Sequence, residues 1–377
     1  LDAGNEVAVV PSAMAGVTNQ LVDYVERAGD TFDASEFDAV VSTGEQVTAG
    51  LLAVALQDLG VTARSWSGWQ IPIATNNAHG GARIESIDTD ELDRCMKAGE
   101  VPVVAGFQGL GPDGRVTTLG RGGSDTSAVA LAAALNAECC DIYSDVDGVY
   151  TADPRIVAKA RKLDKITYDE ILAMASLGAK ILQTRSVEAA MKHRVPLRVV
   201  SSFNDTPGTL VVDESEIVET EIVSGIAYSR DEAKITLQRV ADRPGVAADV
   251  FGPLAEADVN VDMIVQSSSE DGGSTDITFT VARLDMDRAL KILEDLRPTI
   301  AYGKMFSDAD VAKISVIGVG MRSHAGVAGR MFAALAEKGI NIQVISTSEI
   351  KVSVLIAEEY TELALRTLHT AYGLDAD

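Results

Sequence analysis

The sequence predicts an α/β protein in two parts, a three-layer α/β/α domain with a mostly parallel sheet followed by two ferredoxin-like βαββαβ units. Short apolar strands alternate with helices over residues 1–212, a pattern typical of a parallel sheet covered on both faces. Residues 235–264 and 316–345 align without a gap at a constant offset of 81 residues, which indicates a repeated unit. The acidic stretch DESEIVETE, residues 213–221, predicts the boundary between the two parts.

Each predicted element of the first part is read from its apolar pattern. A buried strand is expected at 6–10, followed by a small-residue loop and a helix that enters at Thr18 and Asn19. A second short strand is expected at 39–43, before a helix that runs from Glu45 to about Leu59. Further strands are expected at 61–67, 72–75, 101–107, 141–144 and 197–201, and further helices at 90–98, 168–182 and 186–192.

The centre of the first part is the stretch TTLGRGGSDTSAVALAA, residues 117–133, in which a glycine-dense loop enters an alanine-rich helix. Glycines allow backbone N–H groups to approach a ligand, and a helix N-terminus favours a bound anion. Ser124 and Asp125 are expected at the cap of the helix, and Arg121 can bind a carboxylate or phosphate through paired hydrogen bonds. A glycine loop alone is more often a surface turn, but the arginine and the motifs described below favour a binding site.

Two other features allow both a structural and a functional interpretation. Ser12, Thr18 and Asn19 offer hydroxyl and amide groups in the loop after the first strand, although such residues more often cap a helix. Glu45 lies near a helix start, where the helix dipole favours a negative charge. Its functional interpretation is an anchor for a substrate ammonium group.

The segment ECCDIYSDVDGVYTADPR, residues 138–155, predicts a strand followed by an acidic turn. Asp145, Asp147 and Asp153 raise the question of calcium, but the glutamate that closes an EF-hand loop is missing. A nucleotide or magnesium role fits this turn better. Lys180 follows a glycine and, with Arg155, is a candidate phosphate contact, although a lone lysine is usually a solvated surface group.

The net charge of −24 disfavours binding to nucleic acid or to an acidic membrane surface. The acidic residues are spread along the chain, which leads to the hypothesis of a salt-adapted host; the unfolding temperature should then rise between low and molar salt. No uncharged apolar run reaches the roughly 18 residues of a membrane helix, and we expect a cytoplasmic protein. The three cysteines and four histidines show no metal-type or triad spacing, so no metal site is expected on the protein itself.

Four motifs, in this order, carry a resemblance to a known family: SAMAGVTN, TTLGRGGSDTSA, IYSDVDGVYTADPR and SLGAKIL. With the tandem repeat, they closely resemble aspartate kinases, which have an amino-acid-kinase (carbamate-kinase-like) fold and paired ACT domains. The resemblance covers residues 7–374. It implies a catalytic domain at 1–212, a linker and a strand contributed to the second ACT unit at 213–232, ACT 1 at 233–305 and ACT 2 at 306–377.

The resemblance implies transfer of the ATP γ-phosphoryl group to the side-chain carboxylate of L-aspartate, giving 4-phospho-L-aspartate. This reaction is the first step of lysine, threonine and methionine biosynthesis, with Mg²⁺ bridging the phosphates and feedback inhibition by lysine, threonine or both. The alternatives are another kinase of this fold, acting on glutamate or a nucleotide, and a non-catalytic amino-acid sensor. A homodimer or higher even-numbered oligomer is expected.

The resemblance also assigns residues to three sites. The substrate site would comprise Ser12, Ala13, Thr18, Glu45, Arg121, Ser124 and Asp125, with Glu45 on the ammonium group and Arg121 on the α-carboxylate; Arg121, Asp125 and Lys180 would be catalytic. The ATP site would comprise Ser144, Asp145, Tyr150, Asp153, Arg155 and Lys180. The effector site would comprise Asp242, Gly245, Val246, Ala247, Asn260, Asp262, Gln266, Asn341 and Ile342.

One family motif is not found. Aspartate kinases open with a strand that ends in Lys-Phe-Gly-Gly, whose lysine contacts the transferred phosphate, and this sequence has no such segment before SAMAGVTN. The chain begins at Leu1 rather than at a methionine. We therefore expect further residues, including this motif, to precede Leu1.

Overall fold

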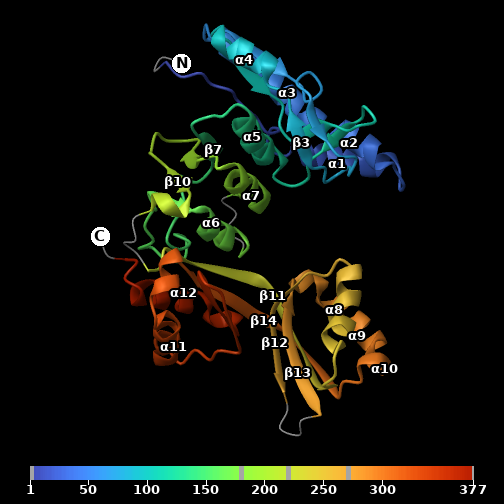
Figure 1. Cartoon of the computed structure of the whole chain (residues 1–377), viewed down its shortest axis with the longest axis vertical. Coiled ribbons are helices and arrows are strands. Elements are labelled where there is room, and N and C mark those ends of the chain that lie inside the picture. The colour runs from blue at the N-terminus through green and yellow to red at the C-terminus, as the bar shows by residue number, and fades with distance from the viewer. Residues whose placement is uncertain (1–3, 178–181, 218–221, 269–272, 376–377) are drawn as a thin grey trace. The chain divides into compact units, whose positions relative to one another are not determined.

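A computed structural model describes residues 4–177, 182–217, 222–268 and 273–375 of the chain (Figure 1). The chain forms two compact units. Unit 1 contains Leu1–Val149, Asp164–Ala175 and Lys180–Ile217, and unit 2 contains Tyr150–Leu163, Ser176–Ala179 and Val218–Asp377. This division differs from the boundary expected near residue 213, because residues 150–163 belong to the second unit.

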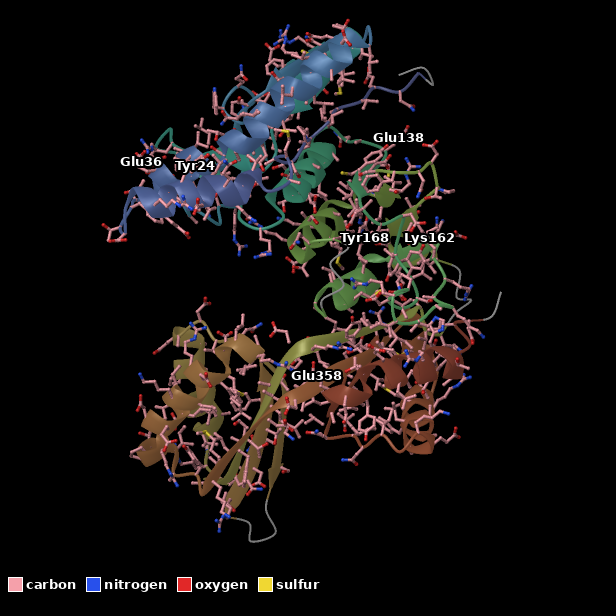
Figure 2. The ribbon with its side chains drawn as sticks, turned by 180° about the vertical axis from the view of Figure 1, so that it is seen from behind. Tyr24, Glu36, Glu138, Lys162, Tyr168 and Glu358 are labelled. Carbon is pink, nitrogen blue, oxygen red and sulfur yellow. The ribbon has the colours of Figure 1, made fainter. Side chains whose placement is uncertain are left out.

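Three helices open unit 1: α1 (Val17–Ala28), α2 (Ala34–Val41) and α3 (Thr43–Asp58). The helix expected from Thr18 is confirmed, but the strand expected at 39–43 is wrong, because the end of α2 and the start of α3 occupy this stretch. The side chain of Asp33 accepts the N–H of Ser35 and caps α2, which favours the helix despite its β-branched end. Tyr24 on α1 and Glu36 on α2 are labelled in Figure 2, and both are exposed.

The strand expected at 6–10 forms only in part. Val9 makes an isolated parallel bridge to Val103, and the flanking residues have no regular secondary structure. Residues 7–10 are half-buried rather than buried.

The strands of unit 1 form three sheets, and the expected α/β class with parallel pairing is confirmed. β1 (Ala63–Trp66) lies parallel to β4 (Val101–Val104). A second sheet has the order β3 (Ile84–Ile87), β2 (Ile73–Thr75), β5 (Gln108–Leu110) and β6 (Val116–Thr118), in which β2 and β5 are parallel. A third has the order β7 (Cys140–Ser144), β9 (Leu197–Ser201), β10 (Thr209–Val212) and β8 (Lys165–Thr167), with β7–β9 and β8–β10 parallel.

Four further helices belong to unit 1: α4 (Asp90–Lys97), α5 (Gly123–Ala134), α6 (Tyr168–Ala175) and α7 (Thr184–His193). The alanine-rich sequence of α5 has a high intrinsic helix propensity. Its side chains Val129, Leu131 and Ala132 are buried, so α5 is a core helix whose N-terminus is reached through the glycine loop.

Unit 2 is built on one antiparallel sheet of six strands, in the order β12 (Val261–Ser268), β13 (Ser274–Val281), β11 (Gly225–Ala241), β14 (Lys304–Ile317), β16 (Lys351–Ala357) and β15 (Val344–Thr347). Helices α8 (Val246–Glu256), α9 (Met286–Asp295) and α10 (Arg297–Ile300) form one group, and α11 (Val327–Glu337) and α12 (Thr361–Ala371) form the other. Figure 1 shows the long strands β11 and β14 running between the two groups. Each group covers its own hydrophobic core.

The gapless repeat is visible in the two groups of helices. Helices α8 and α11 have 11 residues each, and each follows a glycine in the left-handed region, Gly245 with φ 92° and Gly326 with φ 97°. The same turn therefore places the same helix against the sheet in both copies. The structure therefore confirms the two expected ferredoxin-like units, each with its helices packed on the shared antiparallel sheet.

By length and composition, the described residues contain one helical stretch that could cross a membrane, Ala34–Asp58. This is weak evidence, because a core helix of a soluble protein passes the same test. The stretch comprises α2 and α3 and carries the buried carboxylates of Asp38 and Glu45.

Candidate active site

The glycine loop projects Arg121 from between two left-handed residues, Gly120 with φ 78° and Gly122 with φ 69°. Glycine adopts this conformation without the strain that a side chain would add. Arg121 is exposed, and its guanidinium has no hydrogen-bond or ion-pair partner among the residues that the structure describes. It is therefore available to an external anion.

The expected cap of α5 is wrong in its position. Gly122 is the N-cap and no side chain caps the helix, so Ser124 and Asp125 lie within the first turn. Ser124 instead packs closely against Gly106, where a Cβ atom would lie 2.9 Å from the Ser124 Cβ. Asp125 is half-buried, and this burial raises the pKa of its carboxyl group.

Glu45, in the first turn of α3, is buried, and its two carboxylate oxygens have different surroundings. Oε1 accepts a hydrogen bond of 3.1 Å from the backbone N–H of Ala13. Oε2 is buried and has no hydrogen-bond partner among the residues that the structure describes. Burial raises the pKa of Glu45 above its usual value, and the N–H of Ala13 opposes this shift. An unpaired buried carboxylate oxygen is costly unless a ligand satisfies it.

Close backbone packing brings the three loops of the candidate site together. A Cβ on Gly44 would lie 2.9 Å from the Cβ of Ala13, so the start of α3 lies directly on the loop 11–13. The N–H of Gly106 donates to the carbonyl of Pro11 at 3.4 Å, and Gly106 in turn contacts Ser124. The structure thus places Ala13, Glu45 and Ser124 in one cluster. Ser12 is exposed in the same loop, and Thr18 is half-buried near the start of α1.

Sequence reasoning missed Gln108, a fully buried amide on β5. Its Nε2 donates to the carbonyl of Ser42 at 3.0 Å, immediately before α3. Its Oε1 accepts from the side chain of Gln46 at 3.3 Å. Gln108 therefore holds the start of the helix that carries Glu45.

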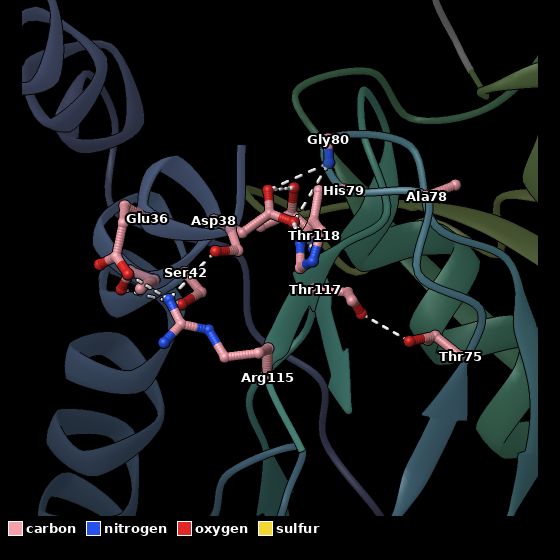
Figure 3. A network of polar contacts seen from close by, with 12 residues as sticks. Glu36, Asp38, Ser42, Thr75, Ala78, His79, Gly80, Arg115, Thr117 and Thr118 are labelled. Carbon is pink, nitrogen blue, oxygen red and sulfur yellow. Dashed lines mark hydrogen bonds and ion pairs between the residues drawn. The ribbon is translucent and has the colours of Figure 1, made fainter. Parts of the chain in front are cut away.

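A second missed residue is Asp38, which lies on α2 and is fully buried (Figure 3). Its carboxylate accepts hydrogen bonds from the backbone N–H of Thr118 at 2.9 Å and from the Thr118 hydroxyl at 2.5 Å. It also accepts from the N–H of Gly80 at 3.1 Å and lies 2.8 Å from Nδ1 of His79. One carboxylate thus joins α2, the connection between β2 and β3, and β6.

These contacts continue into the glycine loop. A Cβ on Gly120 would lie 3.0 Å from the carbonyl oxygen of Gly80, so the 78–80 turn packs directly against the loop. The Arg185 guanidinium donates to the carbonyls of Leu119 and Ala82. Side-chain atoms of Gln183 fill the space beside Gly122. The loop that presents Arg121 is therefore supported by residues that lie far from it in the sequence.

The residues assigned to the nucleotide lie on both sides of a unit boundary along the chain. In unit 1, the Ser144 hydroxyl donates to the exposed Asp145 at 3.1 Å. In unit 2, Tyr150 forms an isolated antiparallel bridge with Lys162. Lys180 lies outside the described residues.

Asp153 is already engaged within unit 2. Its carboxylate accepts from Nη2 of Arg155 at 2.8 Å and from the Tyr228 hydroxyl at 3.3 Å. The hydrogen bonds from Arg155 lower the pKa of Asp153. The arrangement fixes the direction of Arg155, whose side chain is 85% exposed.

The residues assigned to an effector lie in unit 2, around the starts of α8 and β12 and before β15. Asp242, Ala247, Asn260, Gln266 and Asn341 are exposed, Gly245 is the N-cap of α8, Val246 is buried and Ile342 is half-buried. The backbone of Met263 has φ 48°, beside an irregularity in the pairing of β12 with β13.

Asp262 is not free to bind a ligand in this structure. Its Oδ2 lies 2.8 Å from Nζ of Lys313, and Lys313 also lies 2.5 Å from Oε1 of the buried Glu232. Burial alone would raise the pKa of Asp262, but the hydrogen bond and charge of Lys313 outweigh it and the pKa is lowered. An effector ammonium group would have to compete with Lys313 for this carboxylate.

Comparisons with known proteins identify the family of the chain. Residues 1–201 match the amino acid kinase family, and residues 235–298 and 314–372 each match an ACT domain. The chain is 57% identical to an aspartate kinase of Stutzerimonas stutzeri and 56% identical to an aspartokinase of Pseudomonas aeruginosa, in each case over 100% of this chain and 91% of the relative.

Solved structures give the same result. Escherichia coli aspartokinase III in complex with aspartate and ADP matches with a TM-score of 0.77 and 27% identity, over 97% of this chain and 92% of that one. The same enzyme in complex with lysine and aspartate matches with a TM-score of 0.78, over 96% and 92% of the two chains. The chain belongs to the aspartate kinase family, with an amino acid kinase domain followed by two ACT domains.

Proposed function

We propose that the cluster of Ala13, Glu45 and Ser124, with Arg121 beside it in sequence, is where this aspartate kinase binds L-aspartate. The observation that carries the proposal is the buried Oε2 of Glu45, for which residues 4–177, 182–217, 222–268 and 273–375 supply no partner, while Oε1 accepts the N–H of Ala13. A substrate ammonium group would supply the missing hydrogen bond and neutralise the charge. Arg121, exposed and unpaired, would bind the α-carboxylate through two hydrogen bonds.

The chemistry requires positioning more than proton transfer. An oxygen of the aspartate side-chain carboxylate attacks the γ-phosphorus of ATP, and the bond from that phosphorus to the oxygen of ADP breaks. The carboxylate is already ionised at neutral pH, so no general base is needed. Backbone N–H groups at the start of α5 would stabilise the negative charge that gathers on the transferred phosphoryl group. Ser12, Thr18 and Asp125 would complete the wall of the pocket.

On the nucleotide side, Ser144, Asp145, Tyr150, Asp153, Arg155 and Lys180 would contact ATP. Because Arg155 donates a hydrogen bond to Asp153, we expect the Asp153 carboxylate to orient Arg155 and the Arg155 guanidinium to contact a phosphate. Mg²⁺ would be held mainly by phosphate oxygens, because the described residues contain no group of three or more side chains suited to a metal ion. Bound there, the ion would neutralise phosphate charge during transfer.

We further infer that an amino acid, lysine or threonine or both, regulates the enzyme through unit 2. The exposed loop at Asp242–Ala247 and the turns at Asn260 and Asn341 recur at the same offset in the two ACT copies. The solved relative in complex with lysine and aspartate supports lysine. We also propose the domain boundaries at 213, 233 and 306, an even-numbered oligomer and a cytoplasmic location, as the resemblance to the family implies.

Replacement of Arg121 tests the substrate assignment. Arg121→Ala should raise the KM for L-aspartate by about tenfold or more, the size expected for a charge-assisted pair, while the KM for ATP changes little. Arg115→Ala is the matched control, because Arg115 is an arginine of the same unit that is paired with Glu36 on the surface. Equal increases in both KM values would remove Arg121 from the aspartate site.

A further inference from the structure

The segment Tyr150–Leu163 carries part of the proposed nucleotide site, yet it folds as part of unit 2. Ala152 and Val157 are buried in the same hydrophobic core as Leu365 and Leu368 of α12. The carbonyl of Thr151 accepts the N–H of Ile226 at 2.8 Å, at the start of β11. Lys162, labelled in Figure 2, lies at the end of this segment. The conformation of the segment Tyr150–Leu163 therefore depends on the second ACT unit.

One buried polar contact joins the segment to α12. The hydroxyl of Thr151 lies 2.9 Å from Nε2 of His369, and these side chains are 0% and 1% exposed. The Thr151 oxygen also accepts the N–H of Arg161 at 2.9 Å. Because that N–H occupies one lone pair of the oxygen, the hydroxyl proton is free to be donated to an unprotonated Nε2.

The surroundings of His369 favour a neutral ring. Burial lowers the pKa of His369, Asp375 opposes this shift, and the positive charges of Arg161 and Lys159 reinforce it. Arg161 also donates from Nε to the carbonyl of Leu374 at 2.9 Å, and Lys159 pairs with Asp375 at 3.6 Å. The segment is thus tied to the end of the chain by several polar contacts, of which Thr151–His369 is the buried one.

We propose that His369, acting through Thr151, is a positioning residue for the nucleotide-contacting stretch 150–155, so that the last helix of the second ACT unit is part of the support of the ATP site. This inference rests on the proposed role of Tyr150, Asp153 and Arg155. Only one residue, Ala152, separates the Thr151 anchor from Asp153, which orients Arg155. A change in α12 is therefore transmitted to Arg155 without any contact between effector and nucleotide.

The test uses the full chain and compares two replacements of Thr151. Thr151→Val keeps the shape and removes the hydroxyl, whereas Thr151→Ser keeps the hydroxyl. Thr151→Val should raise the KM for ATP about fivefold or more, at least the effect of one of the two hydrogen bonds that the hydroxyl makes, with little change in the KM for aspartate. Thr151→Ser should restore the KM for ATP.

A matched control removes a threonine hydroxyl elsewhere in unit 2. Thr278→Val removes the hydrogen bond of 3.0 Å between the hydroxyls of Thr278 on β13 and Thr236 on β11. This variant should leave both KM values unchanged. Amide exchange at Arg161 and Ile226 provides a local measurement, because both N–H groups donate to Thr151. Exchange at both should become faster in Thr151→Val.

Arg155→Ala separates failure of this inference from failure of the proposed function. If Arg155→Ala raises the KM for ATP and Thr151→Val does not, His369 and Thr151 are not positioning residues and the nucleotide assignment stands. If neither variant changes the KM for ATP, the segment does not contact the nucleotide and both proposals are wrong. If Thr151→Val raises both KM values to a similar extent and Thr151→Ser does not reverse this rise, the contact between Thr151 and His369 only stabilises the fold.

Discussion

The backbone N–H of Ala13 donates to Oε1 of Glu45 at 3.1 Å, while Oε2 of the same buried carboxylate has no partner within the described part of the chain. The loop 11–13 thus fixes the direction of the carboxylate and satisfies only one of its two oxygens. An arrangement of this kind destabilises the free protein and favours a bound cation. Binding of an ammonium group and protonation of Glu45 therefore compete.

This competition predicts a pH dependence of substrate binding. Because burial raises the pKa of Glu45, the carboxylate takes up a proton at a higher pH than an exposed glutamate does. The KM for aspartate should rise as pH falls toward that raised pKa, while the KM for ATP stays level. Glu45→Gln should raise the KM for aspartate about tenfold or more and remove its pH dependence.

The same variant should make the free protein more stable at neutral pH. As pH rises through the ordinary glutamate range, the unfolded chain loses its proton before the folded chain does, so the raised pKa lowers stability. Glu45→Gln removes this pH-dependent loss of stability, so the unfolding temperature of the variant without aspartate should be higher than that of the unaltered chain. The exposed Glu36→Gln is the control. An unchanged KM with an unchanged pH profile would show that Glu45 does not meet the substrate.

The elements with strong local patterns were predictable from the sequence. Helices α8 and α11 begin at corresponding glycines, and a gapless repeat is sufficient to find both. Helix α2 was missed because its Ala-Val-Val end has the composition of a strand, while the helix depends on the Asp33 cap and on the burial of Asp38. Local composition does not report such contacts.

The candidate site was predictable only where its residues lie in a motif or at a predicted helix start. Ser124 lies in a motif and Glu45 at a helix start, whereas Asp38 and Gln108 hydrogen-bond to backbone groups 80 and 66 residues away, on segments with which they share no pattern. The sequence also did not predict that residues 150–163 belong to unit 2, because Thr151 contacts His369, which lies 218 residues further along the chain. Contacts set by tertiary structure leave no periodic signal in a single sequence.

Asp38 should support both stability and substrate binding. Asp38→Asn replaces one acceptor oxygen by an NH₂ group, so an N–H of Gly80 or Thr118 loses its partner inside the protein. We expect a loss of about 2–3 kcal/mol in the free energy of unfolding, the cost of an unsatisfied buried group. Because these residues support the glycine loop, the KM for aspartate should also rise more than the KM for ATP.

Calorimetric unfolding and steady-state kinetics measure the two effects of Asp38→Asn. Asp88→Asn is the matched control, because Asp88 accepts the N–H of Asp90 on the surface. A variant that is destabilised with unchanged KM values would restrict Asp38 to the fold. A variant with native stability would mean that the buried network does not hold the loop.

The buried pair of Lys313 and Glu232, which the exposed Asp262 joins through Lys313, gives the last prediction. Lys313→Met keeps the length of the side chain but leaves the buried Glu232 without its cation, and breaking such a pair costs about 3–5 kcal/mol. Lys313→Met combined with Glu232→Gln should recover most of this loss, because the remaining buried group is then neutral. The exposed Lys338→Met should unfold like the unaltered chain.

The cluster also separates two roles of Asp262. If an amino-acid effector binds Asp262 through its ammonium group, the Lys313→Met and Glu232→Gln double variant frees that carboxylate, and inhibition should occur at a lower effector concentration. Titration of the kinase activity with lysine and with threonine measures this directly. Unchanged inhibition by both, in a double variant of native stability, would make Asp262 a structural partner of Lys313 and place the effector contacts at the exposed Asp242 and Asn260 instead.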